Sequence, residues 1–168
     1  MDFSAPGGVP TFTTAASNVG FANGIVLTPT GKEVIIASTT DAALWIYDRD
    51  PVTNQLTFRE KIHVSFRPDN LTFDDGLDVD NETAFDKEGK FLRGLIAAGH
   101  PAPLRLYAVS RDPVGKSAPS WVVEVRRGKG EDKAPYGAMG RGKWMGGYYL
   151  RTLYQSEYIH HVPPQYSC

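Results

Sequence analysis

Alternation of apolar and polar residues, without helical periodicity, runs through most of the chain. β-branched residues dominate 33–39, an apolar stretch with Trp and Tyr follows at 43–48, and alternation continues through 55–64. The segment 120–126 has the same character. Short runs of this kind, bounded by turn residues, predict strands. Because no helical pattern exceeds two turns, the sequence predicts an all-β protein.

The predicted strands recur in a fixed order. Each unit begins with a Gly-Lys pair, continues into an apolar strand and reaches a second, aromatic strand. The Gly-Lys pairs stand at 31–32, 89–90 and 142–143. The aromatic strands are expected at 44–47, 104–107 and 154–162. This shared order indicates an internal structural repeat.

A second shared motif follows the first two aromatic stretches. Arg-Asp-Pro-Val occurs at 49–52 and again at 111–114, and Pro ends a strand because it has no backbone donor. Repeats of about 40–50 residues built from short antiparallel strands are typical of β-propeller blades. The sequence therefore predicts one domain, a β-propeller portion of about three four-stranded blades. Their expected boundaries are 21–66, 67–128 and 134–164, with residues 1–12 irregular.

The charge, hydropathy and cysteine content of the chain limit the kinds of partner and bond to expect. The 18 basic and 19 acidic residues give a formal net charge of −1, which gives no reason to expect nucleic acid. No apolar run reaches membrane-spanning length, so no transmembrane segment is expected. The N-terminal residues lack the basic start and apolar centre of a signal peptide. The single cysteine, Cys168, cannot form a disulfide within the chain.

Candidate chemistry gathers at the predicted strand ends. Asn23 lies in the segment 21–25, Asp69 and Asn70 lie in 67–73, and His100 lies in 97–101. In a propeller such ends converge on the central channel, and amide and carboxylate oxygens suit Ca²⁺. The same residues also have an ordinary interpretation, because Asn-Gly and Asp-Asn after Pro are turn signals. The residues alone leave both interpretations open.

Taken in order, these segments resemble the calcium-dependent paraoxonase/arylesterase family. The closing motifs Gly-Ala-Met at 137–139 and Gly-Gly-Tyr-Tyr at 146–149 extend the resemblance, which runs from about Phe21 to Val162. It corresponds to the C-terminal half of the family's six-bladed propeller. It implies a hydrolase of lactones or aryl esters that uses a Ca²⁺ ion in the central tunnel.

The resemblance also implies roles for individual residues. Asn23, Asp69 and Asn70 match calcium ligands of the family. Phe21, His100 and Tyr107 are expected in the substrate pocket, and Asp69 and His100 in catalysis. The remaining ligands of the family lie in the half of its propeller that has no counterpart here.

Two functional hypotheses remain from the sequence. The first is a calcium-dependent hydrolase of a small ester or lactone, incomplete in this chain. The second is a non-catalytic truncated propeller or binding module, with a homodimer completing the ring, because three blades leave open sheet faces and edges. Family members are secreted or membrane-associated, but the chain shows no signal peptide, so the compartment stays open.

Overall fold

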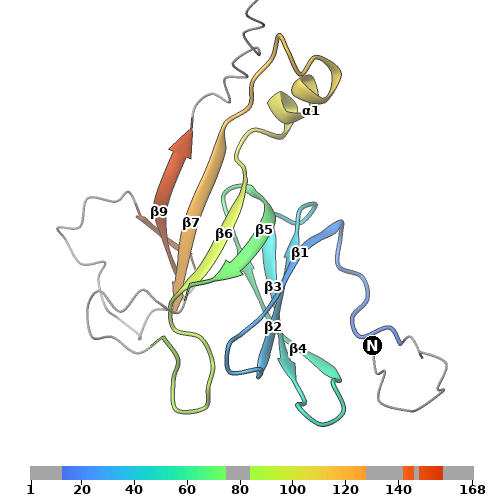
Figure 1. Cartoon of the computed structure of the whole chain (residues 1–168), viewed down its shortest axis with the longest axis vertical. Helices are drawn as coiled ribbons and strands as arrows, with labels where there is room; N and C mark the ends of the chain where they lie inside the picture. The colour runs from blue at the N-terminus through green and yellow to red at the C-terminus, as the bar shows by residue number, and fades with distance from the viewer. Residues whose placement is uncertain (1–12, 75–83, 128–141, 146–147, 157–168) are drawn as a thin grey trace, which may run out of the picture.

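The computed structural model describes residues 13–74, 84–127, 142–145 and 148–156, and Figure 1 shows their arrangement. Two antiparallel sheets account for nearly all of the regular structure, and one short helix accompanies them. The prediction of an all-β protein is therefore confirmed. The helix lies where the sequence predicted a strand, as described below.

The first sheet is a four-stranded meander in the order β1-β2-β3-β4. Its strands are β1 (Ala22–Leu27), β2 (Glu33–Ser38), β3 (Ala43–Arg49) and β4 (Leu56–His63). The strands predicted at 33–39, 43–48 and 55–64 are confirmed. Every residue of β2 is buried, because this strand has β3 and β1 beside it and apolar groups packed over both of its faces.

The second sheet has five strands in the order β5-β6-β7-β9-β8. Its strands are β5 (Arg67–Phe73), β6 (Leu95–His100), β7 (Ser120–Arg127), β8 (Gly142–Met145) and β9 (Tyr148–Ser156). The predicted strand at 120–126 is confirmed. Strands of the expected third unit, 134–164, do not form a sheet of their own among the described residues. β9 instead pairs with the whole length of β7, and this pairing places β8 and β9 in the second sheet.

One helix, α1 (Pro103–Arg111), connects β6 to β7. The strand predicted at 104–107 is therefore wrong. Pro103 occupies the start of the helix, where its fixed φ favours helical geometry, and Leu, Arg and Ala are good helix formers. The second Asp-Pro motif thus follows a helix, whereas the first directly follows β3 as predicted.

The two sheets pack against each other through one apolar core. Figure 1 shows β1 and β5, the first strand of each sheet, next to each other between the remaining strands. Along the strands that face this core, every second side chain is part of it, as expected for a sheet with two distinct faces. Its buried members are Ile35, Ala37, Leu44, Ile46, Ile62, Val64, Phe66, Phe91, Leu95, Ala97, Val123, Val125 and Leu150.

Equivalent turns of the two sheets also lie against each other. Both Gly31 and Gly89 have positive φ, +70° and +80°, which confirms the first two predicted Gly-Lys turns. The Thr30 hydroxyl donates a 2.7 Å hydrogen bond to the Gly89 carbonyl. The third Gly-Lys pair instead lies within β8, so it does not precede a strand in the same way.

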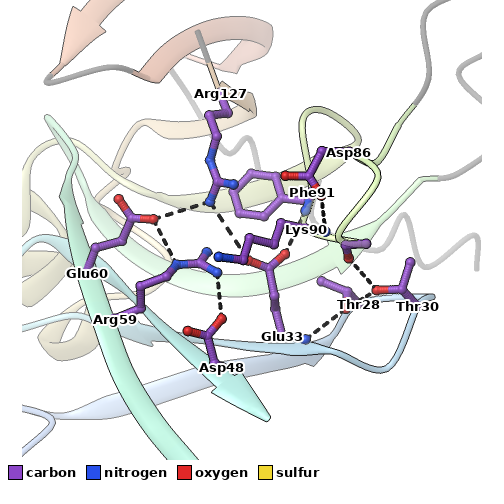
Figure 2. Close-up of polar contacts among 11 residues, drawn as sticks. Thr28, Thr30, Glu33, Asp48, Arg59, Glu60, Asp86, Lys90, Phe91 and Arg127 are labelled. Atoms are coloured by element: carbon purple, nitrogen blue, oxygen red, sulfur yellow. Dashed lines mark hydrogen bonds and ion pairs between the residues drawn. The ribbon is translucent and has the colours of Figure 1, made fainter. Parts of the chain in front are cut away.

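A buried carboxylate fastens the sheets together beside these turns (Figure 2). Glu33 on β2 has no exposed surface, and its Oε2 accepts a 2.6 Å hydrogen bond from the Phe91 backbone N–H. Its Oε1 pairs with Arg59 of β4 and lies 3.8 Å from Arg127 of β7. Glu33 therefore binds groups from both sheets at once.

Two further carboxylates extend this network. Arg59 contacts Asp48 at 2.7 Å and Glu60 at 3.1 Å, and Glu60 also accepts from Arg127 at 3.2 Å. Burial by itself would lower the pKa of Arg59, but the hydrogen bond and charge of Glu33, with help from Asp48 and Glu60, raise it. These charges are thus paired and hydrogen-bonded, as buried ionic groups in a stable core must be.

Candidate cation site at two adjoining β-bulges

Asn23 lies on an irregularity of the first strand. Between Ala22 and Ile25, the two residues Asn23 and Gly24 stand opposite a single residue of β2, Ala37. This is the two-against-one count of a β-bulge, which increases local twist and redirects side chains. The hairpin-turn interpretation of Asn-Gly is therefore wrong, since both residues lie within a strand.

Asp69 and Asn70 occupy the same position in the second sheet. Between Pro68 and Leu71, these two residues of β5 stand opposite the single residue Ala98 of β6. The turn interpretation of Asp-Asn is wrong for the same reason, because both residues lie within β5. The first strand of each sheet thus carries one bulge, and the candidate oxygen ligands sit on the two bulges.

Gly24 brings the two bulges into contact. A Cβ atom on Gly24 would collide with the Asp69 carbonyl oxygen and would lie 3.0 Å from the Leu71 nitrogen and 3.1 Å from the Asn70 Cα. Only glycine permits such an approach between two backbones. The backbones of the Asn-Gly and Asp-Asn segments therefore lie directly against each other.

Thr39 ties the starts of the two strands to each other. Its backbone N–H donates to the Phe21 carbonyl at 3.2 Å, and its hydroxyl donates to the Pro68 carbonyl at 2.7 Å. The Arg67 guanidinium donates in return to the carbonyls of Thr39, at 3.1 Å, and Thr40. These reciprocal bonds hold the segment before Asn23 against the segment before Asp69. No local sequence signal marks Thr39 or Arg67 for this role, because their partners are distant in the chain.

The oxygen groups of the bulges are open to solvent. Asn23 and Asn70 are exposed and Asp69 is half-buried. Together they offer one carboxylate and two amide oxygens, the donor chemistry of a hard cation such as Ca²⁺. In the described part of the chain, no three His, Cys, Asp or Glu residues cluster closely enough to hold a metal. Any cation here would therefore depend on the amides as well as on Asp69.

Phe21 is an exposed and strained residue beside the first bulge. Its side chain is 70% exposed and its φ is +44°, a region that bulky residues rarely adopt. Hydrogen bonds from Thr39 to its carbonyl and from Ser38 to the carbonyl of Gly20 hold the backbone there. Strain of this kind concentrates at binding and catalytic sites, which makes Phe21 a candidate contact for a ligand.

His100 ends β6, opposite Arg67 at the start of β5. Its Nδ1 lies 3.3 Å from the Pro119 carbonyl and 3.3 Å from the Ser120 hydroxyl. Pro119 directly precedes β7 and Ser120 begins it, so these contacts hold the imidazole beside the start of β7.

Gly99 allows His100 to reach this place. A Cβ atom on Gly99 would collide with the Arg67 carbonyl oxygen and would lie 2.7 Å from the Phe66 ring. The chain of β6 can therefore approach the start of β5 only with glycine at this position. The sequence alone does not mark Gly99 for this role, since the role depends on a neighbouring strand.

Tyr107 lies on α1, outside the two bulged strands β1 and β5. Its side chain is 56% exposed, and the Arg111 guanidinium stacks on its ring at 4.8 Å. The structure places the bulge of Asn23 and the bulge of Asp69 and Asn70 backbone to backbone, with Phe21 directly before the first bulged strand.

Comparison with known proteins assigns no family. The chain matches no protein-family model and no curated protein at a significant level. Within the described residues, no helix has the length and apolar character needed to cross a membrane. The geometry at the two bulges is therefore the main basis for a functional proposal.

Proposed function

We propose that the two sheets are neighbouring blades of a propeller and that their adjoining bulges form part of a calcium-dependent hydrolase site. The observation that carries the proposal is the backbone contact between Gly24 and the Asp69–Asn70 bulge. This contact supports the proposal because it places the backbones that carry the candidate ligands against each other. Lactones and aryl esters are the proposed substrates, on the basis of the resemblance to paraoxonases and arylesterases.

Three features support the blade arrangement. The first strands of the two sheets adjoin, as strands nearest the axis of a propeller do. The bulges occupy matching positions in these strands, and the Gly31 and Gly89 turns lie against each other. Two units that match at three positions are expected from a structural repeat.

The donor groups suit calcium as part of a larger shell. Asn23, Asp69 and Asn70 would hold the ion through side-chain oxygens, and Ca²⁺ takes six to eight such ligands, so water or other groups must supply the rest. When bound, the ion would polarise the ester carbonyl. These three residues therefore position the cation, and Asp69 supplies the only negative charge among them.

Other residues of the chain would handle the substrate. His100 ends β6 opposite Arg67, and its imidazole would accept a proton from an attacking water. The exposed Phe21 ring offers an apolar contact for the aryl or alkyl part of the ester. Tyr107 is not included, because it stands on α1 away from the bulges.

A calcium titration tests the site directly. Calcium should raise the melting temperature of the wild-type chain, because binding to the native state stabilises it. Asp69→Asn should remove most of this rise and any hydrolysis of phenyl acetate. Glu88→Gln is the matched control. Glu88 is exposed, and its substitution removes one negative charge at a position away from the bulges. An unchanged melting curve with and without EDTA would refute the proposal.

A second candidate function is a non-catalytic propeller portion that assembles with a second copy. The face of the first sheet opposite the core carries Ile25 and Leu27 with exposures of 64% and 48%, and Phe58 with 49%. Ile25 and Leu27 pair with Ile36 and Val34, so they extend one continuous apolar face. Exposed apolar faces of this kind favour association.

Mass measurement separates the two candidates. A homodimer that depends on this face should be lost in Ile25→Lys and kept in Val52→Lys, because Val52 is 86% exposed on a turn elsewhere. Light scattering after size-exclusion chromatography gives the mass of each variant. A monomeric wild-type chain at all concentrations would refute the assembly.

A further inference from the structure

The helix α1 exposes apolar side chains without covering any core. None of its nine residues is buried. Leu104 is 84% exposed, Tyr107 is 56% exposed, and Val114, on the turn after the helix, is 91% exposed. Isolated exposed apolar residues are common, but a helix whose stability usually comes from a packed face rarely leaves them all in water. Within the described part of the chain, no element covers these apolar groups, so they are accessible to a partner.

The exposed groups share one side of the helix. Leu104, Tyr107 and Arg111 are spaced by three and four residues, so they follow each other along one face. The Arg111 guanidinium stacks on the Tyr107 ring at 4.8 Å. Figure 1 shows α1 beyond the ends of β6 and β7, where it stands clear of both sheets. A large, flat partner could therefore reach this face without touching the core.

Positive charge surrounds these apolar groups. Residues 100–120 contain three cations, Arg105, Arg111 and Lys116, and one anion, Asp112, which gives a formal charge of +2 when His is neutral. The whole chain has a charge of −1, so the local sign is opposite to the overall one. The Asp112 carboxylate already accepts the Gly115 backbone N–H at 2.8 Å. The three cations are exposed and can turn toward an anionic partner.

We propose that α1 and the turn after it dock on an anionic lipid surface. Leu104 and Val114 would enter the interface, Tyr107 would lie at the depth of the headgroups, and the three cations would bind lipid phosphates and carboxylates. A small number of exposed apolar side chains surrounded by basic residues is typical of proteins that bind at a membrane interface. A protein groove that binds helices instead selects apolar residues at four successive helical positions. Here Arg111 occupies the last of these positions, which favours the lipid surface.

The expected binding is weak and depends on charge. Stable membrane anchoring usually requires two separate membrane-binding elements, and α1 is a single short one. The association should therefore be reversible. Each basic residue near an anionic surface contributes about fivefold in affinity, and salt should weaken the binding. The proposal does not rest on the hydrolase site, because none of these groups belongs to the bulges.

Sedimentation with lipid vesicles tests the proposal. The full chain is mixed in EDTA with vesicles of phosphatidylcholine alone or with added phosphatidylserine. We expect binding to the phosphatidylserine vesicles and little binding to the neutral ones. Leu104→Ser and Arg105→Glu should each reduce binding at least fivefold. Val52→Ser is the matched control, because Val52 is 86% exposed on the turn between β3 and β4.

Three results would overturn the proposal. The first is a wild-type chain that does not sediment with phosphatidylserine vesicles. The second is equal loss of binding in Val52→Ser and Leu104→Ser, which would indicate a general effect of exposed apolar residues. The third is self-association that Leu104→Ser abolishes while vesicle binding is absent, which would assign α1 to a protein partner. Thermal melting of each variant checks that the fold is retained.

Discussion

Replacing Glu33 with Gln tests how the two sheets are joined. The substitution keeps the size of the side chain and one acceptor oxygen, which can still receive the Phe91 N–H. It removes the negative charge between Arg59 and Arg127. It also turns an amide NH₂ group toward the Arg59 guanidinium, where two donors then face each other. The expected result is a folded protein with weaker contact between its sheets.

The size of the effect follows from burial and from the remaining partners. Removing one member of a buried ion pair costs about 3–5 kcal/mol. Arg59 keeps Asp48 at 2.7 Å and Glu60 at 3.1 Å, so we expect the lower end, about 3 kcal/mol of unfolding free energy. For a chain of this size, that loss lowers the melting temperature by roughly 6–12 °C.

Urea and thermal unfolding followed by circular dichroism measure this loss. Glu88→Gln is the control, because Glu88 is 54% exposed and lies 3.7 Å from a still more exposed Lys87. Such a surface pair should change stability by less than about 0.5 kcal/mol. If Glu33→Gln and Glu88→Gln unfold within about 0.5 kcal/mol of each other, Glu33 does not join the sheets as described.

Two other predictions concern the bulges and the effect of pH. Gly24→Ala should destabilise the protein by about 1–3 kcal/mol and weaken the proposed calcium binding. Gly20→Ala is the control and should cost less stability, because its Cβ would lie 3.2 Å from the Thr40 Cβ. Equal melting temperatures for these two variants would contradict the contact between the bulges. A hydrogen bond from Lys61 holds the pKa of Asp41 below its ordinary 3.8, so Asp41 stabilises the fold above that pH and loses this contribution as it is protonated. Urea unfolding should therefore show Asp41→Asn less stable than wild type at neutral pH, with the difference closing in acid; a constant difference would exclude this linkage.

The strands could largely be predicted because their residues favour one local structure. β2, β3 and β7 are rich in β-branched and aromatic residues, which suit a pleated, buried surface. The segment 104–107 has aliphatic and aromatic residues too, and a run this short fits either a strand or a helix. It became a helix because Pro103 starts one and no neighbouring strand pairs with it.

The candidate site could be predicted in part. Strand ends with oxygen-bearing side chains indicated Asn23, Asp69 and Asn70, and the resemblance named the same residues. Their place on bulges could not be predicted, because a bulge depends on which residue of the neighbouring strand stands opposite. The pairing of β9 with β7 could not be predicted for the same reason, because it depends on which strand lies beside β9 in the folded sheet.

The sequence by itself determined the strands β2, β3, β4 and β7, the turns at Gly31 and Gly89, and which residues carry oxygen-bearing side chains, because these depend on local preference and residue type. Only the tertiary structure decided that the Asn23–Gly24 and Asp69–Asn70 bulges meet, that Thr39 and Arg67 hold them together, and that Glu33 joins the sheets. These contacts link residues far apart in the chain. Their formation depends on how two sheets stack, which no local pattern of residues encodes.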